Sequence, residues 1–322
     1  MESLPRADGG AWLKAGAGLF SLKAGVVERV DRGSPPRDGY RGWTTRGDDL
    51  VLATDLGLHR YTSDGWLDFY DGHPVSEFVT NSSDQWLGIW RYGLVDDHEG
   101  VWSTGPRLPW RDPVVAVELA SDGTVYAATD AHLAIVTAAE TRTIELAGVQ
   151  AMSVDSDDGL WVWTTDRLGR LNGDQIDPRL EAPGSAWSGS GLVALSTGEL
   201  LLWHADGHVD SLDPDSDSLV RTPYQGAIAD RAGGAFVWGS DLRLVHLRAD
   251  GSTDARGGLH APPPWISWDG GLRLVVGTSS GVRVSADLGE SWSPEIPDPG
   301  PIHWLESGEA HSLFSGSTYA RR

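Results

Sequence analysis

Aromatic, arginine and histidine side chains recur in the polar segments, many of them rich in Pro and Gly, that separate the apolar runs of this chain. They are Tyr40, Arg41, Trp43, His73, Arg107, Trp110, Arg111, Trp187, Tyr224, His260, Trp265, His303 and Trp304. Trp, Tyr and Arg dominate binding hot spots because they combine a large contact area with polar groups. On a strongly acidic chain, the set predicts a surface that stacks on sugars or planar ligands, or that anchors a protein partner. The alternative is that these aromatics pack between neighbouring structural units, since Trp and Tyr are mostly buried.

Metal-binding patterns are weaker. The run 213–217, DPDSD, alternates carboxylates as a calcium loop does, but its sixth position is Ser218 rather than Gly and its twelfth position lacks Glu. His204 and His208 are four residues apart in a predicted turn rather than on a helix, so the usual argument for a shared metal-binding face does not apply. We therefore predict no metal ion and no other cofactor.

Catalytic constellations are not recognisable. The chain has no Gly-x-Ser-x-Gly elbow, phosphate loop or dinucleotide fingerprint. His73, Glu77 and His303 lie in segments that could supply an acid/base pair, but scattered His and Glu residues are common in such segments. We assign no catalytic residues, and the sequence favours a protein that is not an enzyme.

The elements that must position these side chains repeat along the chain. Residues 151–154 form an apolar run, 155–159 a polar cluster ending in Gly, and 160–164 a run rich in Trp and Val. A turn is expected at 165–168, followed by a third strand that ends at the hairpin signal Asn172-Gly173. Such a meander cannot bury its own apolar faces in water. It therefore needs neighbours of the same shape.

Copies of the second strand of this unit supply those neighbours. They begin at Gly10, Asp49, Gln85, Thr124, Leu160, Glu199, Ala235, Arg273 and Glu309, with steps of between 36 and 40 residues. This period, with short strands and no amphipathic helix, is typical of four-stranded propeller blades. We predict an all-β fold, a single β-propeller domain over residues 1–322. The nine repeats correspond to nine blades, or to eight with the two chain ends sharing one.

One face of such a propeller is expected to carry the candidate residues. In a blade that runs from the inner to the outer strand, the connections between blades and the turns between second and third strands fall on the same side. The aromatic, Arg and His set occupies those connections and the inner-strand starts beside them. The chain order alone thus predicts a single binding face.

The residues 50–61, LVLATDLGLHRY, resemble the two-component regulator propeller repeat, whose pattern is roughly Gly-x-Leu-Trp-Ile-Gly-Thr-x-x-Gly-Leu-x-Arg-Tyr. The fifth copy, residues 158–171, resembles it too and is also similar to the repeat of streptogramin-lyase-type propellers. The resemblance covers nearly the whole chain at the level of blades. It implies an architecture, and propellers host many unrelated functions.

The eighth copy ends in residues 285–292, SADLGESW, which resemble the Asp-box pattern Ser-x-Asp-x-Gly-x-Thr/Ser-Trp. The resemblance implies a structural hairpin in which the Asp287 carboxylate accepts turn N–H groups and Gly289 takes a tight conformation. Trp292 is expected to pack on the blade.

Charge and composition limit the partners. The formal net charge of −21 disfavours binding to nucleic acid and to anionic membranes. No apolar segment follows the first residues and Cys is absent, so we expect a cytoplasmic location, although a leader removed earlier would be compatible with the same sequence.

Two functions follow from these observations. The first is a non-enzymatic, rigid binding or scaffold domain that presents the interblade face to a protein or a glycan. The alternative is a lyase or glycoside hydrolase with its active site at the mouth of the central channel. Convergent His, Glu, Asp or Tyr groups in a deep pocket there would distinguish the enzyme from the binding domain.

Overall fold

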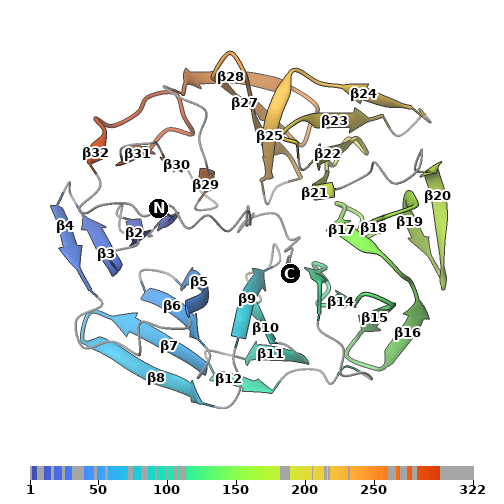
Figure 1. Ribbon diagram of the computed structural model, residues 1–322, viewed down its shortest axis with the longest axis horizontal. Helices are drawn as coiled ribbons and strands as arrows, with labels where there is room; N and C mark the ends of the chain where they lie inside the picture. The colour runs from blue at the N-terminus through green and yellow to red at the C-terminus, as the bar shows by residue number, and fades with distance from the viewer. Residues whose placement is uncertain are drawn as a thin grey trace. The chain divides into compact units, whose positions relative to one another are not determined.

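The computed structural model describes residues 2–5, 11–15, 18–23, 26–30, 40–46, 49–54, 57–71, 75–80, 86–90, 93–98, 101–104, 108, 114–181, 189–204, 206–213, 216, 218–230, 233–259, 266–268, 274–277 and 281–297. These residues form eight four-stranded sheets, each built from four consecutive strands (Figure 1). The described part of the chain contains no helix, and so none long and apolar enough to cross a membrane.

Backbone contacts divide the chain into two units, Met1–Phe78 with Arg256–Glu309 and Val79–Ala255 with Ala310–Arg322. Three sheets lie wholly in the first unit. The strands of these sheets are β1 (Glu2–Pro5), β2 (Ala11–Ala15), β3 (Gly18–Lys23) and β4 (Val26–Arg29); β5 (Tyr40–Arg46), β6 (Asp49–Thr54), β7 (Gly57–Thr62) and β8 (Gly65–Asp71); and β29 (Ile266–Trp268), β30 (Leu274–Gly277), β31 (Gly281–Ser285) and β32 (Ile296–Pro297).

Three further sheets lie wholly in the second unit. Their strands are β13 (Ala116–Leu119), β14 (Val125–Ala128), β15 (His132–Val136) and β16 (Thr141–Glu145); β17 (Val149–Val154), β18 (Leu160–Thr164), β19 (Arg167–Asn172) and β20 (Gln175–Glu181); and β21 (Gly189–Ala194), β22 (Leu200–His204), β23 (Val209–Leu212) and β24 (Leu219–Arg221). The unit boundaries fall within β9 and β28, each in one of the two remaining sheets. Those sheets contain β9 (Val75–Thr80), β10 (Trp86–Trp90), β11 (Gly93–His98) and β12 (Val101–Thr104), and β25 (Tyr224–Ala229), β26 (Ala235–Gly239), β27 (Arg243–Leu247) and β28 (Thr253–Gly258).

The sequence repeat is confirmed at the level of these sheets. Each of the first eight copies begins within one residue of a second strand, from β2 to β30. The ninth copy, with His303 and Trp304, lies outside the described residues, so the choice between eight and nine blades stays a prediction, as does the single domain. The turn expected at 165–168 is shorter than predicted, because the Thr164 hydroxyl accepts the N–H of Arg167 at 3.1 Å and β19 begins there.

In the second unit, the apolar faces of neighbouring sheets bury one another. The inner strands β13, β17, β21 and β25 pack together in that order. Between the first two of these sheets, Leu133 and Ile135 pack with Met152 and Val162 in one apolar cluster. Two further clusters of buried apolar side chains lie between the next pairs of sheets. Burying one such side chain stabilises the fold by about 1.5–3 kcal/mol. The stability of each sheet therefore depends on its neighbours, as expected for a meander that cannot bury its own apolar faces.

In the first unit, aromatic rings join two sheets. The ring of Tyr61 on β7 lies edge-on to Trp12 on β2, with 5.5 Å between centroids, and 5.2 Å from the ring of Trp66. The indole N–H of Trp66 donates to the Val30 carbonyl at 2.9 Å. Trp residues at blade positions thus pack between sheets here.

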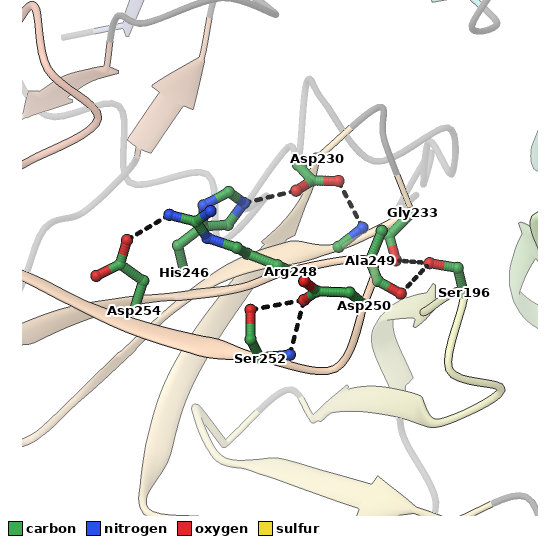
Figure 2. Close-up of polar contacts among 10 residues, drawn as sticks. Ser196, Asp230, Gly233, His246, Arg248, Ala249, Asp250, Ser252 and Asp254 are labelled. Atoms are coloured by element: carbon green, nitrogen blue, oxygen red, sulfur yellow. Dashed lines mark hydrogen bonds and ion pairs between the residues drawn. The ribbon is translucent and has the colours of Figure 1, made fainter.

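The turns between first and second strands follow one design and link adjacent sheets. In residues 120–124, 155–159, 195–199 and 230–234, the N–H of the first residue donates to the carbonyl of the fifth. The fourth residue has a positive φ: Gly123 and Gly198 at 86°, Gly233 at 86° and Asp158 at 59°. Figure 2 shows the Ser196 hydroxyl reaching the carbonyls of Gly233 and Ala249 in the next sheet, at 2.8 and 3.1 Å.

Asp residues close two of these turns. Asp230 accepts the N–H of Gly234 with one carboxylate oxygen and lies 2.6 Å from His246 Nε2 with the other (Figure 2). Asp155 likewise accepts the N–H of Gly159 with one carboxylate oxygen, and its other oxygen pairs with the guanidinium of Arg170. Carboxylates at this end of the blades are therefore used to hold the turns.

In the hairpin at residues 285–292, the Asp287 carboxylate bonds to Ser291. One carboxylate oxygen accepts the backbone N–H of Ser291 at 2.9 Å, and the other accepts its hydroxyl. Gly289 has a φ of 89°. Hydrogen bonds from the Ser291 hydroxyl and N–H, and from the Ser285 hydroxyl, lower the pKa of Asp287 to about 2.

Candidate functional site

The other end of the sheets, where second strands turn into third strands, differs from the turn-linked end. In four sheets the inner strand begins with a β-bulge, in which two residues oppose one on the second strand. The extra residue is polar each time: Arg41, Gln150, Ser190 and Gln225. Bulges re-aim side chains and are common next to binding sites. A polar residue thus recurs at the bulge of each of these four inner strands.

A small residue follows each bulge and receives an aromatic ring in three consecutive sheets. Ala151, Gly191 and Gly226 pair with Trp163, Trp203 and Trp238 on the second strands. A Cβ on Gly226 would lie 2.1 Å from the Trp238 ring, so the indole occupies the space above the glycine. The Trp203 and Trp238 rings are 6.2 Å apart and nearly perpendicular. The indoles hold the bulged ends in place.

The sequence-predicted residues are placed only in part. Tyr40, Arg41 and Trp43 lie on β5, the first two at its bulge. Tyr224 begins β25, is half-buried, and packs with Trp203 against the apolar cluster between two sheets. Burial, with a smaller contribution from Glu199 and Asp241, raises the pKa of Tyr224. The remaining predicted residues, His73, Arg107, Trp110, Arg111, Trp187, His260, Trp265, His303 and Trp304, lie outside the described residues.

The structure also brings together a cluster at this end that the sequence argument rejected. His204 ends β22 and His208 precedes β23, and the N–H of His204 donates to the His208 carbonyl at 2.9 Å. Gly207, with a φ of 84°, allows the tight turn between them. The two imidazoles are stacked, with 4.2 Å between centroids and 9° between planes. The helix argument for a shared face does not apply to this pair, and the two rings meet for another reason: residues that flank a three-residue hairpin loop lie opposite each other.

Two carboxylates face the stacked rings. Asp210 Oδ2 lies 3.0 Å from His204 Nε2 and 3.4 Å from His208 Nε2. Asp206, in the turn, contacts His208 Nδ1. The buried His204 ring also meets the Trp163 indole of the preceding sheet, 5.2 Å away and edge-on. Burial, followed by the charge of His208, lowers the pKa of His204 despite the opposing effect of Asp210. The lowered pKa favours the neutral form of His204.

Comparison with known proteins identifies the fold. No family model matches the sequence, and no curated protein matches it. Among solved structures, virginiamycin B lyase from Staphylococcus aureus superposes with a TM-score of 0.51 at 13% identity, over 74% of this chain and 91% of that chain. The WD40 β-propeller domain of Doa1 gives a TM-score of 0.53 at 14% identity, over 81% of this chain and 95% of that chain.

The chain has a β-propeller fold. The extracellular domain of a one component system protein from B. thetaiotaomicron is similar as well, with a TM-score of 0.52 at 13% identity, over 91% of this chain and 45% of that chain. The propeller therefore agrees with the resemblance to two-component regulator propeller repeats, and each described sheet is one blade. At these identities the likeness is one of fold alone.

Proposed function

We propose that this propeller is a rigid binding domain, and that it binds a protein or a glycan through the end of the blades that carries the bulges and the turns between second and third strands. The observation that carries the proposal is the bulge repeated in three consecutive blades of the second unit, which places Gln150, Ser190 or Gln225 at that end of each blade. At the opposite end, Asp155, Asp230 and Ser196 are engaged in closing turns and linking blades.

A rigid scaffold suits this task because little conformational entropy is lost on binding. The Trp residues that cover the bulged strands fix the backbone that presents the polar side chains. The partly buried ring of Tyr224 lies beside the exposed Gln225 at the same strand start. Aromatic and amide groups side by side are well suited to sugars and to polar protein surfaces.

The first experiment replaces three residues of the predicted face, Trp110, Arg111 and Trp265, with Ala in one variant. Pull-down from the native cells and a glycan array are then compared for wild type and variant. The matched control replaces three exposed apolar residues of outer strands, Val26, Leu67 and Val220, with Ala. We expect binding to be lost in the first variant and kept in the control. Unchanged binding by the first variant would contradict the proposal.

An enzyme is the second candidate, favoured by one observation. His204 is buried, has a pKa lowered by burial and lies 3.0 Å from a carboxylate, as a general base often does. The similar virginiamycin B lyase was also crystallised in a catalytically inactive form with quinupristin. Incubation of quinupristin with the wild-type protein and with a His204→Gln variant, followed by chromatography, tests this candidate. No change in quinupristin would count against a lyase of that specificity.

A further inference from the structure

His204 departs from the pattern of its neighbours in the repeat. In the two preceding blades a threonine, Thr129 directly after β14 or Thr164 at the end of β18, accepts with its hydroxyl the N–H of the first residue of the third strand. At the same position the third of these blades has His204, and its turn is one residue longer, which brings in His208. The substitution replaces a turn-closing hydroxyl with an imidazole and adds a second one opposite.

The nitrogen atoms of this pair converge with a carboxylate. One donor atom from each of His204, His208 and Asp210 lies within 4.8 Å of the other two. A tetrahedral ion with bonds of about 2.0–2.1 Å needs ligand atoms about 3.3–3.4 Å apart. The distance from Asp210 Oδ2 to His208 Nε2, 3.4 Å, meets that requirement, and the distance to His204 Nε2, 3.0 Å, is about 0.3 Å shorter.

The Nε2 atom of His204 is shielded from solvent and faces Asp210 Oδ2 at 3.0 Å. The side chain is only 8% exposed. Buried charges are paired or coordinate metal ions, and a cation between this nitrogen and the Asp210 carboxylate would have a ligand atom on each side.

Asp206 orients the second imidazole. Its carboxylate contacts His208 Nδ1, which favours the tautomer with the proton on that nitrogen and leaves the Nε2 lone pair on the side of Asp210. A carboxylate bonded to the far nitrogen of a metal-binding histidine is a common supporting contact.

We propose that His204, His208 and Asp210 bind one divalent transition-metal ion of the Zn²⁺ class, with the fourth coordination position open to water or to a ligand. Two imidazoles and one carboxylate suit Zn²⁺, Ni²⁺ or Cu²⁺, whereas Ca²⁺ and Mg²⁺ prefer sites made entirely of oxygen. Binding requires the parallel rings to tilt apart so that both lone pairs meet one ion. The less buried His208 ring, at 19% exposure against 8% for His204, makes most of that movement.

The proposal goes beyond the proposed function and does not depend on a macromolecular partner. The experiment uses the full chain after treatment with a chelator, and calorimetric titration with Zn²⁺ measures stoichiometry and affinity. We expect one tight equivalent in the wild type, and its loss in His208→Gln and Asp210→Asn. The control is Asp241→Asn, an exposed carboxylate in the corresponding turn of the next blade, which should keep the tight equivalent.

A second variant separates the site from a general loss of folding. Asp206 is 67% exposed, so Asp206→Asn should leave the fold intact and weaken Zn²⁺ binding by about 10–100-fold. Substitution of Co²⁺ gives a visible absorption band that reports tetrahedral nitrogen and oxygen ligands in the wild type. Equal Zn²⁺ binding by wild type, His208→Gln and Asp206→Asn, or no tight equivalent in the wild type, would overturn the proposal.

Discussion

The backbone N–H and the hydroxyl of Ser121 donate to the two carboxylate oxygens of Asp158, at 2.8 and 2.6 Å, across the boundary between adjacent blades. Asp158 holds this position with a φ of 59°, in the left-handed region. Ser196 makes the corresponding contact with the carbonyl of Gly233, so the second residue of one turn bonds to the fourth residue of the next. The blades are thus linked at one end by a repeated polar contact.

Two replacements of Asp158 distinguish the contribution of its hydrogen bonds to stability from the cost of its left-handed backbone conformation. Asp158→Ala loses both hydrogen bonds and places a Cβ-bearing residue of poor left-handed propensity at a positive φ, so we expect a loss of about 2 kcal/mol in the free energy of unfolding. Asp158→Gly loses the hydrogen bonds but tolerates the backbone, and should cost about 1 kcal/mol. Urea unfolding measures both. Equal losses would mean that the backbone conformation carries no strain.

Two glycines at equivalent positions should respond in opposite ways to alanine. A Cβ on Gly226 would lie 2.1 Å from the Trp238 ring, whereas a Cβ on Gly191 would meet Trp203 at an ordinary 3.8 Å. Gly226→Ala should therefore destabilise the protein by about 1–3 kcal/mol through overpacking. Gly191→Ala should be neutral or stabilising by up to about 1 kcal/mol, because it restricts the unfolded chain. Thermal unfolding of the two variants gives the comparison, and equal destabilisation would contradict the role assigned to the Trp238 ring.

The Asp287 hairpin should depend on acid pH. Its pKa is lowered to about 2 from the usual 3.8, chiefly by the Ser291 hydroxyl. Since the folded-state pKa is depressed, the contribution of Asp287 to stability is fully present above pH 3.8 and is lost as the pH falls through about 2. Unfolding temperatures of wild type and Asp287→Asn should therefore converge between these pH values. A constant difference down to pH 2 would contradict the depressed pKa.

The strands could be predicted from the sequence because the same apolar runs and turn residues recur in each copy of the repeat. Alternating apolar runs and a Gly or Asp at each turn located the second strands to within one residue, as at Leu160 and Ala235. Such signals are local, and local turn chemistry is what sequence patterns express well.

The candidate site was predicted less well, for two physical reasons. The bulges at Gln150 and Gln225 depend on the pairing of two strands, which no single segment specifies. The His204 and His208 pair was dismissed because four-residue spacing was judged by helix geometry. The His-Ala-Asp-Gly-His pattern was the available signal, since Gly207 before His208 indicates a tight hairpin that places the two histidines opposite each other.

The central claim is that the two ends of the blades have different tasks, with ligand binding at the bulged end. The most direct measurement compares two exposed polar residues changed to the same large cation, Gln225→Arg at the bulged end and Ser156→Arg in a turn at the opposite end. Affinity for the partner or glycan recovered with the wild-type protein is then measured by surface plasmon resonance. The account predicts at least about a tenfold loss for Gln225→Arg and no change for Ser156→Arg, since about 1.4 kcal/mol at a contact corresponds to that factor. A loss for Ser156→Arg with unchanged binding by Gln225→Arg would contradict it.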